Sequence, residues 1–381
     1  MNHIKKIVLL ILGLGFLGCT GTRPEEKQAL LISASYHGDI ETVNRLIAEG
    51  VDVNARMGKD GIFALQAAAN QNQIAVAEAL LNAGADIHLL SSTLWSAMAE
   101  ACYEGHINIV YLLVEHGVNL EQKVTSNIST VLSIAASQGH ADIVSYLLQK
   151  GANVNDPDKD GWTALHYAVR NESLETAKIL IVNNANINAK DKAGKSPFML
   201  AAQSANVEML TYLQSQKADI SAKDKAGGNA LFYACGGGNI ENVKFLLEAG
   251  LDINSRDKNL WTPLAVAVKQ GQFSIVKYLI EKGAEIDPPD TTGWTPLFHA
   301  CREGHYEIAK YLVEKGANIN RTSIHQVTPL MLAAHEGNLD IVKMLVEKGA
   351  NVHAKDEDGW KAIDSARAAK HTHIVNYLKQ F

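Results

Sequence analysis

Two cysteine–histidine pairs of identical spacing consist of residue types that bind zinc. Cys102 and His106 form the first pair, and Cys301 and His305 form the second. A tetrahedral zinc site needs four converging ligands, and no second pair lies beside either of these in the sequence. We therefore expect no zinc site.

An aspartate-rich segment has the start of a calcium-binding pattern. Residues 156–161 are Asp-Pro-Asp-Lys-Asp-Gly, but the twelfth position, which needs a bidentate glutamate, is Tyr167. Residues 194–196 (Gly-Lys-Ser) match only the end of a phosphate-binding loop, because Ala189 stands where its first glycine is required. We expect neither calcium nor phosphate to bind at these positions.

Motifs of catalysis are missing from the sequence. It contains no Gly-x-Ser-x-Gly, no His-Glu-x-x-His and no Gly-x-Gly-x-x-Gly. The 41 acidic and 35 basic residues are spread along the chain, which argues against a nucleic-acid binder with a basic face. Four cysteines in 381 residues exclude a disulfide scaffold, and 47% hydrophobic residues exclude a disordered chain. We predict no catalytic activity, no cofactor and no small-molecule substrate.

The sequence is periodic instead. The tetrapeptides that begin at Thr163, Thr262, Thr295 and Thr328 share the pattern Thr-(Ala/Pro)-Leu-x, and their leucines are separated by multiples of 33 residues. Self-similarity at such a period is typical of a solenoid. We call this 33-residue spacing the ruler. Extended in both directions, with two steps of 34, it gives Leu31, Leu65, Met98, Leu132, Leu165, Phe198, Leu231, Leu264, Leu297, Leu330 and Ile363.

The period that starts at Asp290 shows how each unit is built. Asp290 opens a tight turn, and Pro296 starts a helix, where its missing N–H costs nothing. Gly304 ends this helix, and a second one over residues 306–315 carries apolar side chains at helical spacing before Gly316 stops it.

This pattern resembles the ankyrin repeat, which runs Asp-x-x-Gly-x-Thr-Pro-Leu-His-x-Ala-Ala, then Gly-His, then Gly-Ala-Asp-Val-Asn. The resemblance covers residues 27–381 in eleven units, with repeats 1 and 11 as caps; in repeat 11, Arg367 and Lys370 suit a terminal face. It implies an all-α repeat solenoid of helix-turn-helix units with β-hairpin fingers. It also implies protein–protein recognition through the finger tips and the concave face of the first helices.

The centre of the array departs from the pattern. Glu172, Asn184 and Lys217 stand where helix-ending glycines are expected, and repeat 7 ends its first helix with three glycines, residues 236–238. A glycine inside a helix costs up to about 1 kcal/mol relative to alanine. We expect repeats 5–7 to be the least stable part.

The first residues resemble a bacterial lipoprotein signal. Lys5 and Lys6 precede an apolar run, residues 7–17, which is too short to span the ~30 Å hydrocarbon core comfortably. Gly18 and Cys19 follow this run, as at the cleavage site of a lipoprotein.

The lipoprotein resemblance implies that residues 1–18 are cleaved, that Cys19 is lipidated, and that residues 19–26 form a tether. The mature chain would then be exported and anchored by lipid to a membrane, facing the periplasm or the cell exterior. Two alternatives stay open: cleavage by an ordinary signal peptidase, which gives a soluble secreted protein, or a retained anchor.

All five tryptophans occupy one position of the ruler, just before the threonine of the tetrapeptide. Other repeats carry Ser129, Lys195, Gly228 or Val327 there, so we expect the position to be at least half exposed. In the ankyrin family this position lies on the finger, on the binding side. An aromatic residue there can equally pack against the neighbouring finger and stiffen the row, and both interpretations stay open.

Aromatic side chains beside cations are typical of binding hot spots. We therefore predict that repeats 8–10 make the primary contact with a protein partner. The candidate residues are Trp261, Trp294, Lys269, Arg302, Glu303 and His335 for the primary contact, Trp162 and Arg170 for a secondary one, and Trp95 and Trp360 as the remaining members of the row.

Three kinds of function are compatible with such an array. A rigid spacer or envelope organiser would lack a discrete patch of exposed aromatic residues. A surface enzyme would need convergent polar groups in a pocket, which a regular solenoid lacks. We favour a monomeric, non-catalytic scaffold for protein–protein interaction.

Overall fold

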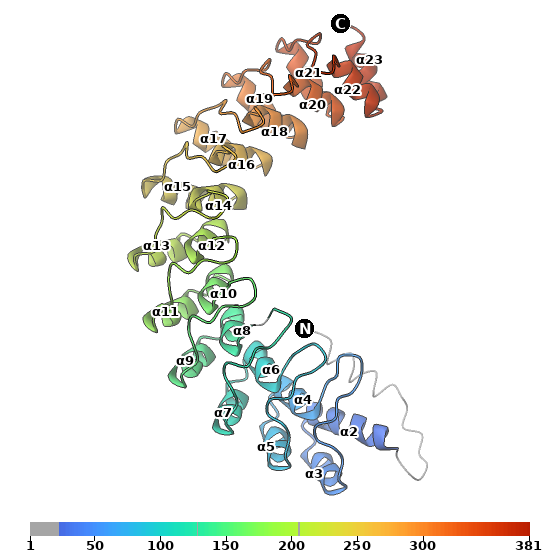
Figure 1. Ribbon diagram of the computed structural model, residues 1–381, viewed down its shortest axis with the longest axis vertical. Coiled ribbons are helices and arrows are strands. Elements are labelled where there is room, and N and C mark those ends of the chain that lie inside the picture. Colours follow the sequence, from blue (N-terminus) through green and yellow to red (C-terminus); the bar gives the residue numbers. More distant parts are fainter. Residues whose placement is uncertain (1–22, 128, 205) are drawn as a thin grey trace. The chain divides into compact units, whose positions relative to one another are not determined.

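The computed structural model describes residues 23–127, 129–204 and 206–381. Its helices follow one another in short pairs, one pair to a repeat (Figure 1), and fall into two compact units, the first ending at Lys192 and the second beginning at Ala193. The expected signal peptide, residues 1–18, and Cys19 lie outside the described residues. The first helix among the described residues begins at Pro24, within the expected tether.

The first unit contains ten of these helices: α2 (Pro24–His37), α3 (Ile40–Ala48), α4 (Ala64–Asn70), α5 (Ile74–Asn82), α6 (Ala97–Glu104), α7 (Ile107–Glu115), α8 (Val131–Gln138), α9 (Ala141–Gln149), α10 (Ala164–Arg170) and α11 (Leu174–Val182). The second unit continues with α12 (Pro197–Ser204), α13 (Val207–Ser215), α14 (Ala230–Gly237), α15 (Ile240–Glu248), α16 (Pro263–Lys269), α17 (Phe273–Glu281), α18 (Pro296–Glu303), α19 (Tyr306–Glu314), α20 (Pro329–His335), α21 (Leu339–Glu347), α22 (Ala362–Ala368) and α23 (Thr372–Leu378). Repeats 8, 9 and 10 are thus the pairs α16–α17, α18–α19 and α20–α21.

The core of each unit runs through the stacked helices. First helices pack on first helices and second helices on second helices, as α16, α18 and α20 do in the second unit. The ruler residues from Leu31 to Leu330 are buried, while Ile363 in the last pair is half-buried. The fold predicted from the 33-residue period, an all-α repeat solenoid, is therefore confirmed.

Helix ends follow local chemistry. The Thr262 hydroxyl caps α16 by accepting the Ala265 N–H at 3.2 Å, and Pro263 occupies its first turn. Glu172, Asn184 and Lys217 adopt the left-handed conformation of the glycines they replace, with φ of 57°, 67° and 65°. Each non-glycine residue there costs on the order of 1 kcal/mol.

The turn before each first helix is called here the finger turn. In the described residues, antiparallel bridges between strand-like residues occur at Met57–Ile62 and Val124–Ser129, so the β-pairing of the fingers is short. Backbone bonds join one finger turn to the next: the Thr291 N–H donates to the Asn259 carbonyl at 3.1 Å. The turns of a unit thereby form a continuous row.

The glycines at the end of α14 differ in what surrounds them. A Cβ added at Gly237 would overlap the carbonyl oxygen of Gln203 in α12, whereas one at Gly236 would meet only a Val266 methyl at 3.5 Å. Gly238 has a φ of 85° and ends the helix. Gly237 is thus required by a close helix approach, and Gly236 is not.

We predict opposite effects for the two substitutions. Gly236→Ala should raise the free energy of unfolding by up to about 1 kcal/mol through helix propensity. Gly237→Ala should lower it by about 1–3 kcal/mol, because α12 and α14 must separate. Urea unfolding of the full chain measures both, and a Gly237→Ala protein as stable as the wild type would contradict the close approach.

Candidate protein-binding surface

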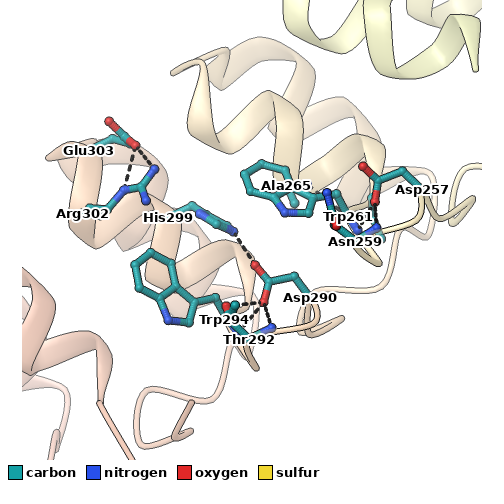
Figure 2. A network of polar contacts seen from close by, with 11 residues as sticks. Asp257, Asn259, Trp261, Ala265, Asp290, Thr292, Trp294, His299, Arg302 and Glu303 are labelled. Carbon is teal, nitrogen blue, oxygen red and sulfur yellow. Dashed lines mark hydrogen bonds and ion pairs between the residues drawn. The ribbon is translucent and has the colours of Figure 1, made fainter. Parts of the chain in front are cut away.

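The finger turn fixes the backbone of each tryptophan. Oδ1 of Asp290 accepts the N–H of Thr292 at 2.8 Å and that of Trp294 at 3.0 Å. Asp257 does the same for Asn259 and Trp261, each at 2.8 Å. One carboxylate therefore closes the turn and sets where the indole starts (Figure 2).

The residue eight positions after each tryptophan decides what covers its ring. Arg170, Lys269 and Arg302 lie over the rings of Trp162, Trp261 and Trp294, each with the cationic group 5.2 Å from the ring centroid. Such cation–π contacts contribute about 0.5–1 kcal/mol at partly exposed sites.

The two remaining tryptophans lack such a cation. Tyr103 packs edge-on against Trp95, with the ring centroids 5.5 Å apart. Ala368 holds the equivalent position after Trp360, which stays 47% exposed. The other four tryptophans are well under half exposed, so the expectation of a position that is at least half exposed is wrong for them, because neighbouring rings and cations cover the indoles. Trp95 and Trp360 therefore do not reproduce the aromatic–cation pairing of the other three.

The indole nitrogens distinguish the three cation-covered tryptophans. Trp162 Nε1 donates to Asp191 of the next finger turn at 3.1 Å, so this ring is tied into the scaffold. Within the part of the chain that the structure describes, the indole N–H groups of Trp261 and Trp294 donate to no protein acceptor, and neither nitrogen is buried from solvent. These two rings retain a donor that a partner can use.

The charged side chains beside the two tryptophans are partly organised. Nε and Nη2 of Arg302 donate to Glu303 Oε1 at 2.9 and 2.6 Å, and this bonding lowers the pKa of Glu303. His335 contacts Glu336 at 3.1 Å and belongs to a repeat with Val327 in the tryptophan position. The structure thus groups Trp261, Lys269, Trp294, Arg302 and Glu303, and His335 shares no aromatic contact or ion pair with them.

His299, which was not predicted from the sequence, lies at the centre of this group. Its ring centroid is 4.3 Å from that of Trp261 and 5.5 Å from that of Trp294, and the residue is 2% exposed (Figure 2). Nε2 faces Asp290 Oδ2 at 3.6 Å, and neither ring nitrogen has a hydrogen-bond partner among the described residues.

A signal for His299 does exist in the sequence. The residue nine positions after the turn aspartate faces that aspartate in three repeats: the Tyr167 hydroxyl donates to Asp158 and the Tyr233 hydroxyl to Asp224. His299 stands nine residues after Asp290. A polar ring at this spacing therefore indicates a contact beneath the tryptophan row.

Burial lowers the pKa of His299 to about 4 from its ordinary value near 6.5. The nearby cations Arg302 and Lys269 act in the same direction, while Asp290 and Glu303 oppose them. Because the imidazole is neutral at pH 7, the two tryptophans pack against an uncharged ring.

The motifs that suggested metal chemistry make protein contacts. Asp158 Oδ1 accepts the N–H groups of Asp160 and Trp162, and Asp156 pairs with Lys123. The three described cysteines are buried, which raises the pKa of each thiol. Among the described residues no three His, Cys, Asp or Glu side chains gather in a way that could hold a metal ion.

We predict that His299 makes stability depend on pH. Its folded pKa is depressed, so the unfolded chain binds the proton first as the pH falls below about 6.5, and folding is disfavoured. Between about pH 7 and pH 5 the free energy of unfolding should fall by about 2 kcal/mol more in the wild type than in His299→Leu. Leucine is the chosen replacement because it occupies the equivalent position of repeat 10, at Leu332. Tryptophan fluorescence during urea unfolding measures the difference, and an equal pH dependence would contradict it.

No helix in the described ranges has both the length and the apolar character needed to cross a bilayer.

Ankyrin repeat family models match residues 30–124, 120–191, 178–257 and 251–323 (three-copy model) and residues 312–366 (many-copy model). The mitochondrial disaggregase of Bos taurus is 27% identical over 162 residues, which is 42% of this chain and only 19% of that protein. Since the repeat matches follow one another along most of its length, the chain belongs to the ankyrin repeat family.

Proposed function

We propose that this protein is a non-catalytic scaffold that binds a protein partner through the finger turns and first helices of repeats 8–10. Ankyrin repeats generally mediate binding to other proteins, and the family is typically non-catalytic. The observation that carries the proposal is the pair Trp261 and Trp294, each held over a cation with its indole N–H unpaired among the described residues. Trp162, whose indole is bonded to Asp191, fits a secondary or stiffening role better.

We also propose that the scaffold is attached to a membrane by lipid on Cys19 and faces the periplasm or the cell exterior. The support is the sequence of residues 5–19: two lysines, an apolar run and a Gly-Cys pair. A monomer carrying one such anchor would present its repeats to partners in that compartment.

The binding surface is tested by capture of the partner. Full-length chain bearing its own N-terminus is purified from detergent-solubilised envelopes, and co-purifying proteins are quantified by mass spectrometry. Trp261→Ala with Trp294→Ala should reduce capture of the specific partner by about 30-fold or more, since a hot-spot residue contributes about 2 kcal/mol. The same preparation should show an acylated Cys19 in the membrane fraction.

A matched control removes two aromatic residues from the other helices of the same repeats. Phe273 in α17 and Tyr311 in α19 contact each other, with ring centroids 5.7 Å apart. Phe273→Ala with Tyr311→Ala should leave capture intact. Equal capture by the tryptophan variant would favour a spacer with stiffening tryptophans, and loss of capture in the control alone would place the contact on the second helices.

A further inference from the structure

One position of the finger turn carries unexpected backbone strain. The residue just before the tryptophan position is left-handed, and it is glycine at residues 161, 194, 227, 293 and 359. In repeats 3 and 8 it is leucine instead, with a φ of 63° at Leu94 and 61° at Leu260, and in repeat 10 it is Gln326, with a φ of 57°. A side chain in this conformation costs on the order of 1–2 kcal/mol.

Steric crowding adds to this strain. A Cβ built at Gly227 would lie 3.0 Å from the backbone nitrogen of Lys258, and one at Gly293 would lie 3.0 Å from that of Ile324. A side chain at this position therefore presses on the next finger turn. Leu260 gains little burial in return, because it remains 39% exposed. Stability alone favours glycine here. Leu260, unlike Leu94 and Gln326, adjoins a tryptophan covered by a cation, which points to a role in binding.

Leu260 is part of an apolar edge along the row of turns. It adjoins Trp261, and the Thr291 N–H joins its turn to the next. The Ile324 N–H then donates to the Thr292 carbonyl at 3.1 Å, which brings a 62% exposed isoleucine into the same row. We call Leu260, Trp261, Trp294 and Ile324 the apolar edge.

Lysines supply the positive charge around the apolar edge, because the charge of Arg302 is offset by its ion pair with Glu303. Lys225 and Lys258 are exposed on successive finger turns and make no ion pair within the described part of the chain, while Lys269 and Arg302 cover the two indoles. The carboxylates there are already engaged. Asp257 and Asp290 bind backbone N–H groups of their own turns, and Glu303 binds Arg302.

We propose that the apolar edge binds an acidic segment of the partner protein that carries large apolar side chains, and that Leu260 determines its specificity. This inference rests on the binding function proposed above. The cations complement carboxylates, and the apolar edge complements leucine or aromatic side chains between them. The positive charge follows the row of finger turns, because Lys225 and Lys258 lie on the turns and the cationic groups of Lys269 and Arg302 lie over the indoles, and an extended chain can follow such a row.

Peptide selection tests the chemistry of the partner. A random library of 12-residue peptides is selected on the immobilised full chain and counter-selected on the Trp261→Ala, Trp294→Ala variant. The enriched peptides should be rich in Asp and Glu and contain Leu, Phe or Trp. Enrichment of basic or uncharged peptides would overturn this inference and leave the binding function standing, whereas peptides that bind the variant equally would overturn both.

Substitution of the leucine tests its role. Leu260→Gly should raise the melting temperature by about 2 °C by relieving strain, and weaken binding of the selected acidic peptide by about tenfold. Leu94→Gly is the matched control, since it relieves the same strain in repeat 3 and should not change binding. Unchanged affinity in Leu260→Gly, or an equal loss in Leu94→Gly, would overturn the proposal.

The same proteins are titrated with vesicles that contain phosphatidylglycerol. If Leu260→Gly abolished vesicle binding and left peptide binding unchanged, the ligand of the apolar edge would be a lipid surface and not a protein segment. The proposal expects no difference between wild type and Leu260→Gly in this titration.

Discussion

The finger turn depends on one side-chain oxygen, an aspartate carboxylate in repeats 8 and 9 and the Ser323 hydroxyl in repeat 10, and the row of turns depends on each turn being closed. In repeat 9, Oδ1 of Asp290 accepts two backbone N–H groups, so the chain reverses within five residues. The closed turn then offers the Thr292 carbonyl to the Ile324 N–H of the next turn. Because the bonds are made by backbone groups, they constrain the shape of every turn and leave side chains at the tip free to vary.

This constraint explains why tryptophan and leucine can stand where neighbouring repeats have other residues. The backbone of Trp294 is held by Asp290, and Arg302 at the end of α18 holds its ring. The indole is therefore ordered before any partner arrives, so little side-chain entropy is lost on binding. His299 contributes by filling the space between Trp261 and Trp294 with a neutral ring.

The sequence predicted what is local and periodic. The 33-residue ruler located the helix pairs, and the position of Trp261 and Trp294 before the threonine placed both on the finger turns, near Lys269 and Arg302. What it missed depends on contacts between repeats. The burial of His299 needs the tryptophan of the preceding repeat.

Two further features were beyond a single-sequence pattern for the same reason. Nothing in the sequence separates Gly237 from Gly236, because only the fold brings the Gln203 carbonyl of α12 against Gly237. The strain at Leu260 comes from its positive φ. A sequence does not display φ, and only the glycines at the equivalent positions of other repeats suggest it. The proposed lipid anchor depends on residues 1–19, which the described structure does not include.

The partner is proposed to contact the finger turns and first helices of repeats 8–10. Hydrogen–deuterium exchange of the full chain, measured alone and in complex with the captured partner, examines this contact without any substitution. We expect the partner to slow exchange in residues 257–269 and 290–303 and to leave α17 and α19 unchanged. Protection confined to the second helices, or to the first unit, would contradict it.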